Sequence, residues 1–115
     1  IMGNGAAGEE IDAVDYELGT PTHALVIASS RNHPRGMMIA REDLRFVIPD
    51  EWVHSQVRAD ITFFETASGG AVLSLSSMTW CGSLSHNNFN NGISQLTENA
   101  VRRFSNPEPF RLPSI

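Results

Sequence analysis

The sequence predicts a fold that combines strands and helices, of the α/β or α+β class, and this prediction rests on three segments. Residues 24–28 are continuously apolar, which suits a β-strand buried on both faces. Residues 60–78 form two β-rich runs around Ser68-Gly69-Gly70, a pattern typical of a β-hairpin. Apolar residues recur at helical spacing from Ile93 to Phe104, so we expect a C-terminal α-helix after the hairpin.

The first part of the chain is predicted as a loop, a helical turn and a strand. Residues 1–8 are rich in Gly and Ala, which favours a loop. Residues 9–20 hold five acids and have apolar residues at helix-compatible spacings, which predicts a short helical turn. The apolar run at residues 24–28 is expected to be a central strand, and the turn-forming residues 29–36 to be an exposed loop.

The middle of the chain is less regular. Residues 37–46 fit a strand or a helix equally well. Pro49 forces a break, after which Trp52 and Val53 are expected to seal one edge of the core.

The hairpin and the residues after it give the clearest expectations. Phe63 and Phe64 must point to opposite faces of their strand, so we expect that strand to be covered on both sides. A polar loop is predicted at residues 80–84, and the Asn-rich residues 87–91 can cap the last helix. The apolar face of this helix comprises Ile93, Leu96, Ala100, Val101 and Phe104.

Length and charge restrict the classes of protein. The chain has 115 residues, 41% of them hydrophobic, so it fits a single domain or a domain fragment with a modest core. Its net charge of −5 disfavours nucleic acid and anionic membranes as partners. Cys81 is the only cysteine and cannot form an internal disulfide, and no apolar run approaches the roughly 18 residues that cross a bilayer. We therefore expect a cytoplasmic location, and we interpret the chain as the end piece of a longer protein.

Four blocks of sequence follow one another in a recognisable order. They are Gly5-Ala6-Ala7-Gly8-Glu9-Glu10-Ile11-Asp12, Leu18-Gly19-Thr20-Pro21, Phe63-Phe64-Glu65-Thr66 through to Trp80-Cys81-Gly82-Ser83-Leu84, and Asn91 to Phe104. Their succession resembles the C-terminal region of the large (beta) subunits of the N,N-dimethylformamidase family, over nearly the whole chain. No single block is a catalytic signature.

The resemblance implies a fold, an activity and partners. The fold would be the C-terminal part of a class I glutamine amidotransferase-like α/β domain with a mixed sheet. The parent protein would be an iron-dependent amidohydrolase that converts N,N-dimethylformamide, or a similar small amide, to formate and an amine. Its partners would be the remainder of the large subunit and a small subunit, in a hetero-oligomer.

The family's mononuclear iron has tyrosine and glutamate ligands. Tyr16 is the only tyrosine of this chain, so a centre with two tyrosinate ligands cannot be housed in these residues alone. We therefore expect the iron ligands to lie upstream of Ile1, no cofactor to be bound by this fragment, and the isolated fragment to be inactive.

Glu10 is the candidate catalytic residue. It follows a loop rich in Gly and Ala, where small residues let a carboxylate reach a neighbouring site and move a proton near the iron. The competing interpretation is a solvated acid stabilised by a helix dipole. Glu9 and Asp12 are weaker candidates for the same role.

Other reactive side chains point to a site less clearly. Cys81 with His86 as its base would be a nucleophile pair, but five residues of loop fix no geometry, and a buried small hydrophobe is the usual role of a free cysteine. Glu65, at a strand end beside a turn, is expected to serve structure. The histidines are too scattered for a metal site and are expected to be surface or locally bonded residues: His23, His33, His54 and His86.

Two alternative functions remain. The chain could be a non-catalytic α/β scaffold or interaction module that uses residues 80–91 for subunit contacts. A cysteine hydrolase of the glutamine amidotransferase-like type is a more remote alternative, because Cys81 lies late in the chain and opens no long helix.

Overall fold

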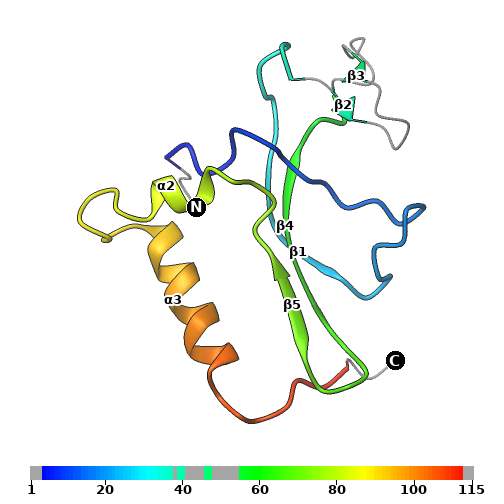
Figure 1. Ribbon diagram of the computed structural model, residues 1–115, viewed down its shortest axis with the longest axis vertical. Helices are drawn as coiled ribbons and strands as arrows, with labels where there is room; N and C mark the ends of the chain where they lie inside the picture. The colour runs from blue at the N-terminus through cyan, green and yellow to red at the C-terminus, as the bar shows by residue number, and fades with distance from the viewer. Residues whose placement is uncertain (1–3, 38, 41–45, 48–54, 113–115) are drawn as a thin grey trace.

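The computed structural model describes residues 4–37, 39–40, 46–47 and 55–112. The elements are β1 (Leu25–Ser30), β2 (Ile39–Ala40), β3 (Phe46–Val47), β4 (Ala59–Glu65), β5 (Ala71–Ser74), α2 (Trp80–Ser83) and α3 (Gly92–Phe104). Strands β1, β4 and β5 form one sheet with β4 in the centre, and α3 lies along one side of it (Figure 1). Strands β2 and β3 pair separately.

All pairings between the described strands are antiparallel, so the mixed sheet that we predicted is wrong for this part of the chain. The helices follow the sheet in sequence instead of alternating with its strands. This arrangement corresponds to the α+β alternative. A three-stranded antiparallel sheet does not by itself identify a glutamine amidotransferase-like domain.

Strand β4 is covered on both faces, as its paired phenylalanines predict. Phe63 packs against the Phe110 ring at 5.7 Å between centroids, on the side of the sheet that faces α3. Phe64 meets the edge of the His23 ring at 6.3 Å on the other face. The first four residues of β4 are all buried. The sheet therefore sits between α3 on one side and the N-terminal segment on the other.

The prediction of a central strand at residues 24–28 is wrong, because β1 lies at an edge of the sheet and pairs with β4 alone among the described strands. Leu25, Val26 and Ile27 are 60%, 46% and 48% exposed. An apolar run shows that a strand is suited to burial, but it does not show which segments of this chain cover it. The strand also continues to Ser30, and the exposed loop begins only after it.

The helical turn predicted over residues 9–20 is wrong for residues 9–15, and only residues 16–19 form a turn, where the Thr20 N–H donates to the Asp15 carbonyl at 3.0 Å. The main-chain N–H of Asp12 donates to the Ser76 carbonyl (2.9 Å), and the Asp60 N–H donates to the Asp12 carbonyl (2.9 Å). Ile11 forms an isolated antiparallel bridge with Ser77. Residues 11–12 thus fill the gap where β4 and the chain after β5 diverge. These long-range hydrogen bonds outcompete a weak local preference for helix.

The β4–β5 hairpin confirms the prediction at residues 60–78, although β5 ends at Ser74. Its loop is closed by the Thr66 N–H, which donates to the Gly70 carbonyl at 2.8 Å. Gly69 has a φ of +86°, a conformation that glycine adopts without steric cost. The turn fixes the register in which Phe64 faces Val72.

The polar loop predicted at residues 80–84 contains the short helix α2 instead. Trp80 explains the difference, because its ring is buried among core residues. Its indole N–H donates to the Thr97 hydroxyl at 3.0 Å, which ties α2 to α3. A tryptophan was the feature that argued against a polar loop.

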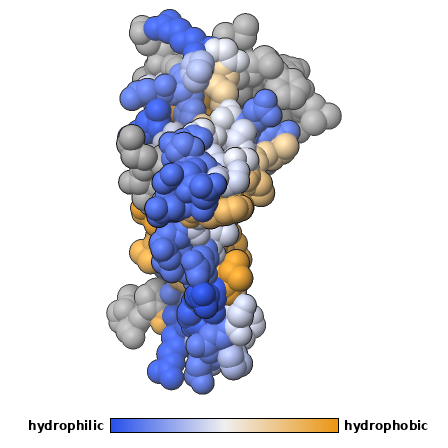
Figure 2. Space-filling model, turned by 90° about the vertical axis from the view of Figure 1, so that its left-hand side faces the viewer, coloured by the Kyte–Doolittle hydropathy of each residue, from blue (hydrophilic) through white to orange (hydrophobic). Residues whose placement is uncertain are grey.

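Helix α3 is confirmed, with Asn91 as its N-cap. The Asn91 side-chain oxygen accepts the Ser94 N–H at 2.9 Å, which satisfies one of the free amides of the first turn. Of the predicted apolar face, Ile93 is fully buried, whereas Val101 and Phe104 are exposed. Figure 2 shows the side of the molecule on which α3 lies as largely hydrophilic, with apolar atoms at its margins.

The core is small. It consists of Ala6, Ile61, Trp80 and Ile93, with Ala28, Leu73, Leu75, Leu84 and Leu96 packed around it. Residues 37–46, which fitted strand or helix, contain the two-residue strand β2 and the first residue of β3. The expectations for Pro49, Trp52, Val53 and His54 lie outside the described residues. Among the described helices, none has the length and apolar character needed to traverse a lipid bilayer.

Candidate functional site

The first block of the resemblance, residues 5–12, is a loop that is fixed to the chain after β5. The Gly8 N–H donates to the Ser77 hydroxyl (3.2 Å), and this hydroxyl donates to the Glu9 carbonyl (2.8 Å). The Met78 N–H also reaches the Glu9 carbonyl at 3.3 Å. A Cβ on Gly8 would lie 3.3 Å from the Thr79 side chain, so the two segments are in close contact. Blocks distant in sequence therefore build one surface.

Glu10 sits at the exposed turn of this loop, with a φ of +48°. This left-handed conformation is costly for a residue with a side chain, and such residues gather at functional sites. The neighbours on both sides hold Glu10 in place, since Glu9 is bonded to Ser77 and Ile11 bridges to the same residue. The loop thus presents the Glu10 carboxylate outward, where a neighbouring segment can meet it. Its catalytic role stays a prediction.

Glu9 and Asp12, the weaker candidates, are also exposed. Both contribute their main-chain atoms to the packing of the loop. Their roles in catalysis likewise stay predictions.

Asp60 is a polar residue of this region that the sequence analysis missed. Its side chain is almost completely buried, and it accepts three hydrogen-bond donors: the Ser29 hydroxyl (2.6 Å), the Val14 N–H (3.0 Å) and the Arg58 guanidinium (2.7 Å). Arg58 also donates to the Val14 carbonyl at 2.8 Å. This carboxylate therefore joins β1, β4 and the N-terminal segment.

Burial alone would raise the pKa of Asp60, but the hydrogen bonds from Ser29, Val14 and Arg58, with the charge of Arg58, outweigh it and hold that pKa below its usual value. Asp60 is thus an ionised structural group that accepts three hydrogen bonds. A signal for it was present in the sequence, because Asp is disfavoured inside strands and Arg58 lies two residues away on the same face.

Among the hydrogen bonds of the described residues, none joins Cys81 to His86. Cys81 is exposed, so its interpretation as a buried small hydrophobe is wrong. It lies in α2, whose buried side chains are Trp80 and Ser83. His86 is exposed in the turn that follows, and its carbonyl accepts the Asn91 side-chain amide at 2.7 Å.

Of the other described histidines, His33 is locally bonded, as expected, whereas His23 bonds to a strand 42 residues away in the sequence. The His23 ring bonds to the Glu65 carbonyl (3.0 Å), and the His33 ring bonds to the Ser30 carbonyl (3.2 Å). Glu65 closes β4 opposite Ala71, which agrees with the structural role predicted for it.

The described residues do not fit an iron centre. No group of three or more His, Cys, Asp or Glu side chains with metal-binding geometry is found in the ranges that the structure covers. Tyr16, the only tyrosine in the sequence, is 54% exposed at a surface turn.

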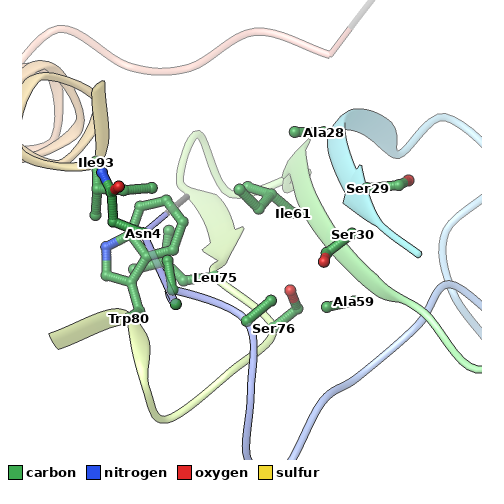
Figure 3. A pocket seen from close by; sticks show the side chains of 13 residues that line it. Asn4, Ala28, Ser29, Ser30, Ala59, Ile61, Leu75, Ser76, Trp80 and Ile93 are labelled. Carbon is green, nitrogen blue, oxygen red and sulfur yellow. The ribbon is translucent and has the colours of Figure 1, made fainter. Parts of the chain in front are cut away.

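A partly open cavity of about 290 Å³ lies between the N-terminal loop, the sheet and the two helices (Figure 3). Its larger apolar walls are Ile61, Leu75, Trp80 and Ile93. None of the residues that line it carries an ionisable side chain. The cavity is therefore uncharged, with both apolar and hydroxyl-bearing side chains in its lining.

Fold and site define an α+β segment that presents an acidic loop, with Glu10 in a left-handed conformation, and an uncharged cavity. The chain matches the family described as "N,N-dimethylformamidase beta subunit-like, C-terminal" over residues 2–93, and it belongs to this family. The resemblance seen in the four sequence blocks is thereby confirmed.

Two relatives carry the name "N,N-dimethylformamidase beta subunit". The protein from Paracoccus aminophilus is 43% identical over 114 residues, which cover 97% of this chain and 15% of the relative. The protein from Alcaligenes sp is 41% identical over 111 residues, which cover 95% of this chain and 15% of the relative. This chain thus spans about 15% of the length of the curated relatives that it matches.

Proposed function

We propose that this chain is the C-terminal part of the large (beta) subunit of an amidohydrolase that acts on N,N-dimethylformamide or a similar small amide. The proposal is supported chiefly by the 43% identity, over 97% of the chain, to a protein named N,N-dimethylformamidase beta subunit. In this reaction water adds to the amide carbon and the C–N bond breaks. The acyl half leaves as formate, and the nitrogen takes a proton and leaves as dimethylamine.

We place the reactive iron of this enzyme outside the chain. The described residues contain no group of three or more His, Cys, Asp or Glu side chains that could hold a metal ion, and the sequence has a single tyrosine. The proposed contribution of this chain is to support the site rather than to hold its metal.

The exposed edge of the sheet favours contact with the remainder of the large subunit. Leu25 lies beside Phe63 and Val26 beside Thr62, so the apolar residues of β1 project from both faces of the strand. An edge strand with free main-chain groups and apolar side chains is a template for pairing with further polypeptide. We therefore propose that a strand from the rest of the large subunit covers β1, and that a small subunit completes a hetero-oligomer.

We also propose Glu10 as an acid that moves a proton in the hydrolysis. Replacing it by glutamine in the complete enzyme is expected to lower kcat by about 100-fold or more, since general acid–base catalysis contributes at least that much. The metal content should stay unchanged, because Glu10 is not proposed as a ligand. Turnover and metal analysis of the same preparation check this prediction.

The matched control is Glu17→Gln, which removes another exposed acid of the N-terminal segment. This variant is expected to keep the wild-type rate. If Glu10→Gln also kept that rate, Glu10 would have no part in the mechanism.

The experiment for the function as a whole uses the complete protein that contains this chain, together with its small subunit. N,N-dimethylformamide is supplied, formate and dimethylamine are measured, and iron is quantified. Release of both products by an iron-containing protein supports the proposal. An iron-free protein without turnover would favour the alternative of a non-catalytic scaffold or interaction module, and turnover by the isolated 115-residue chain would contradict the placement of the reactive centre.

A further inference from the structure

A second hollow lies between β4 and residues 12–21 of the N-terminal segment, and it has a buried hydroxyl in its lining. Its volume is about 390 Å³. Figure 1 shows α3 and the N-terminal segment on opposite sides of the sheet. Thr62, a lining residue on β4, is only 8% exposed, and its hydroxyl makes no hydrogen bond to any residue that the structure describes. A buried hydroxyl without a partner is unfavourable, so such a group in a native protein calls for an explanation.

The larger side chains around this hydroxyl are apolar. Val14, Leu18 and Pro21 come from the N-terminal segment, and Phe64 comes from β4. Leu18 is 74% exposed, more than any other large apolar side chain in the described ranges. Exposed apolar surface with a polar rim is typical of sites of protein–protein contact.

The rim of the hollow is acidic. Asp12, Asp15 and Glu17 are exposed along the same segment, and none of them forms an ion pair with a described residue. Arg58 is a cation of the same region, but the Asp60 carboxylate pairs with it at 2.7 Å. The rim therefore carries negative charge without compensation, which complements a partner that bears lysine or arginine.

We propose that this hollow is the docking site for a basic segment of the small subunit. That segment places an apolar side chain beside Leu18 and Phe64, directs its cations to the acidic rim, and supplies a hydrogen-bond partner for the Thr62 hydroxyl. The identity of the partner rests on the proposed function, whereas the basic and apolar chemistry of the segment rests on the rim and the lining. A separate subunit fits this surface better than a further segment of the large subunit, because exposed charges of opposite sign speed the encounter of two separate molecules.

The test measures the Kd between the complete large subunit and the small subunit. Leu18→Ala is expected to raise this Kd about tenfold or more, because apolar anchors at the centre of an interface carry much of its binding energy. The unfolding temperature of the free large subunit should stay unchanged, since Leu18 is exposed there. Leu112→Ala is the matched control, because Leu112 is also exposed and does not line the hollow. An unchanged Kd in Leu18→Ala would overturn the proposal, and so would a lower unfolding temperature of the free large subunit, which would mean that its own chain fills the hollow.

Thr62→Val removes the hydroxyl and keeps a side chain of similar shape. In the free large subunit this substitution should leave the stability unchanged or raise it, since the lost hydroxyl had no partner. In the complex it should raise the Kd about threefold to tenfold, because one hydrogen bond to the small subunit is lost. A less stable free subunit, or an unchanged Kd, would contradict the assigned contact.

The acidic rim is tested by the combined substitutions Asp12→Asn and Asp15→Asn. They should slow association at low salt about threefold or more and weaken its dependence on salt, because two rim charges are lost. The turn is expected to persist, since an amide oxygen at position 15 can still accept the two main-chain N–H groups that Asp15 accepts now. Glu98→Gln combined with Glu108→Gln is the control, because both acids lie outside the hollow. An unchanged salt dependence in the rim variant would contradict the basic character of the docked segment.

These measurements are independent of the test of turnover. Unchanged affinities in variants of a complex that hydrolyses N,N-dimethylformamide would contradict the docking site and leave the proposed reaction standing. Weaker binding by Leu18→Ala and Thr62→Val in a complex without hydrolysis would support the docking site while the proposed reaction fails. A large subunit that binds no small subunit would contradict the docking site whether or not it hydrolyses the amide.

Discussion

Asp60 shows at the scale of a single residue how this small chain holds its N-terminal segment. A carboxylate buried in a strand is unfavourable unless its charge is paired and its lone pairs are used. Here a hydroxyl, an amide and a guanidinium supply that compensation from three segments. The same network fixes residue 14, a few positions after Glu10, so the position of the acidic loop depends on it.

Asp60→Asn is expected to destabilise this region by about 2–4 kcal/mol, because it leaves the partly buried Arg58 without its counter-ion. The measurement is hydrogen exchange of β4 and of residues 12–14. The control is Glu98→Gln, which removes the exposed ion pair between Glu98 and Arg102 and should cost under about 0.5 kcal/mol. Equal effects of the two substitutions would contradict a structural role for the buried pair.

The pH dependence of this network follows from the direction in which folding shifts the pKa of Asp60. The folded state lowers the pKa of Asp60 below its ordinary value of 3.8, so the stabilisation is present above that pH and is lost as the pH falls through the lower folded pKa. Exchange protection of residues 12–14 is expected to decline with acid below about pH 4 in the wild type. In Asp60→Asn this part of the acid dependence should be missing.

At the scale of elements, local contacts set the conformation of some segments, and contacts between distant residues set that of others. Helix α3 was predictable because its cap, its apolar spacing and its two C-terminal arginines all lie within one segment. Residues 9–20 had apolar spacing too, but the main chain of Asp12 is hydrogen-bonded to Ser76 and Asp60 instead of to its own neighbours. Those partners are more than 45 residues away in the sequence, so local patterns carry no signal for them.

The N-cap of α3 gives a prediction at this scale. Asn91→Ala should destabilise the start of the helix by about 1–2 kcal/mol, since it removes the bond to the Ser94 N–H and those to the Leu84 and His86 carbonyls. Hydrogen exchange of the first turn measures this loss. Asn90→Ala is the control, because Asn90 contributes only main-chain atoms to the described hydrogen bonds, and it should cost under about 0.5 kcal/mol.

At the scale of the whole molecule, the exposed edge strand is the feature that the isolated chain does not explain. The sequence of β1 is that of a buried strand, yet this chain covers only one of its edges in the described structure. An exposed apolar edge promotes association with other strands. This conflict between sequence and exposure is resolved if the complete subunit supplies the cover, as we propose.

Val26→Lys is therefore expected to lower the stability of the complete subunit by about 1–3 kcal/mol, since it places a charge in a covered strand. Thermal unfolding of the complete protein measures the effect. Val101→Lys on α3 is the control, because Val101 is more exposed than Val26 and lies outside the sheet. If Val26→Lys were as harmless as Val101→Lys, the outer side of β1 would be a free surface.

The sequence by itself determined the hairpin, the last helix and its cap, the loop character of residues 4–8, and membership in the family. Each of these depends on neighbouring residues or on a succession of blocks, so each can be read along the chain. Only the tertiary structure decided that β1 lies at an edge, that residues 11–12 join the sheet, and that Asp60 and Ser76 are buried. These features depend on contacts between distant segments, because burial and hydrogen-bond partners are set by which surfaces meet after folding.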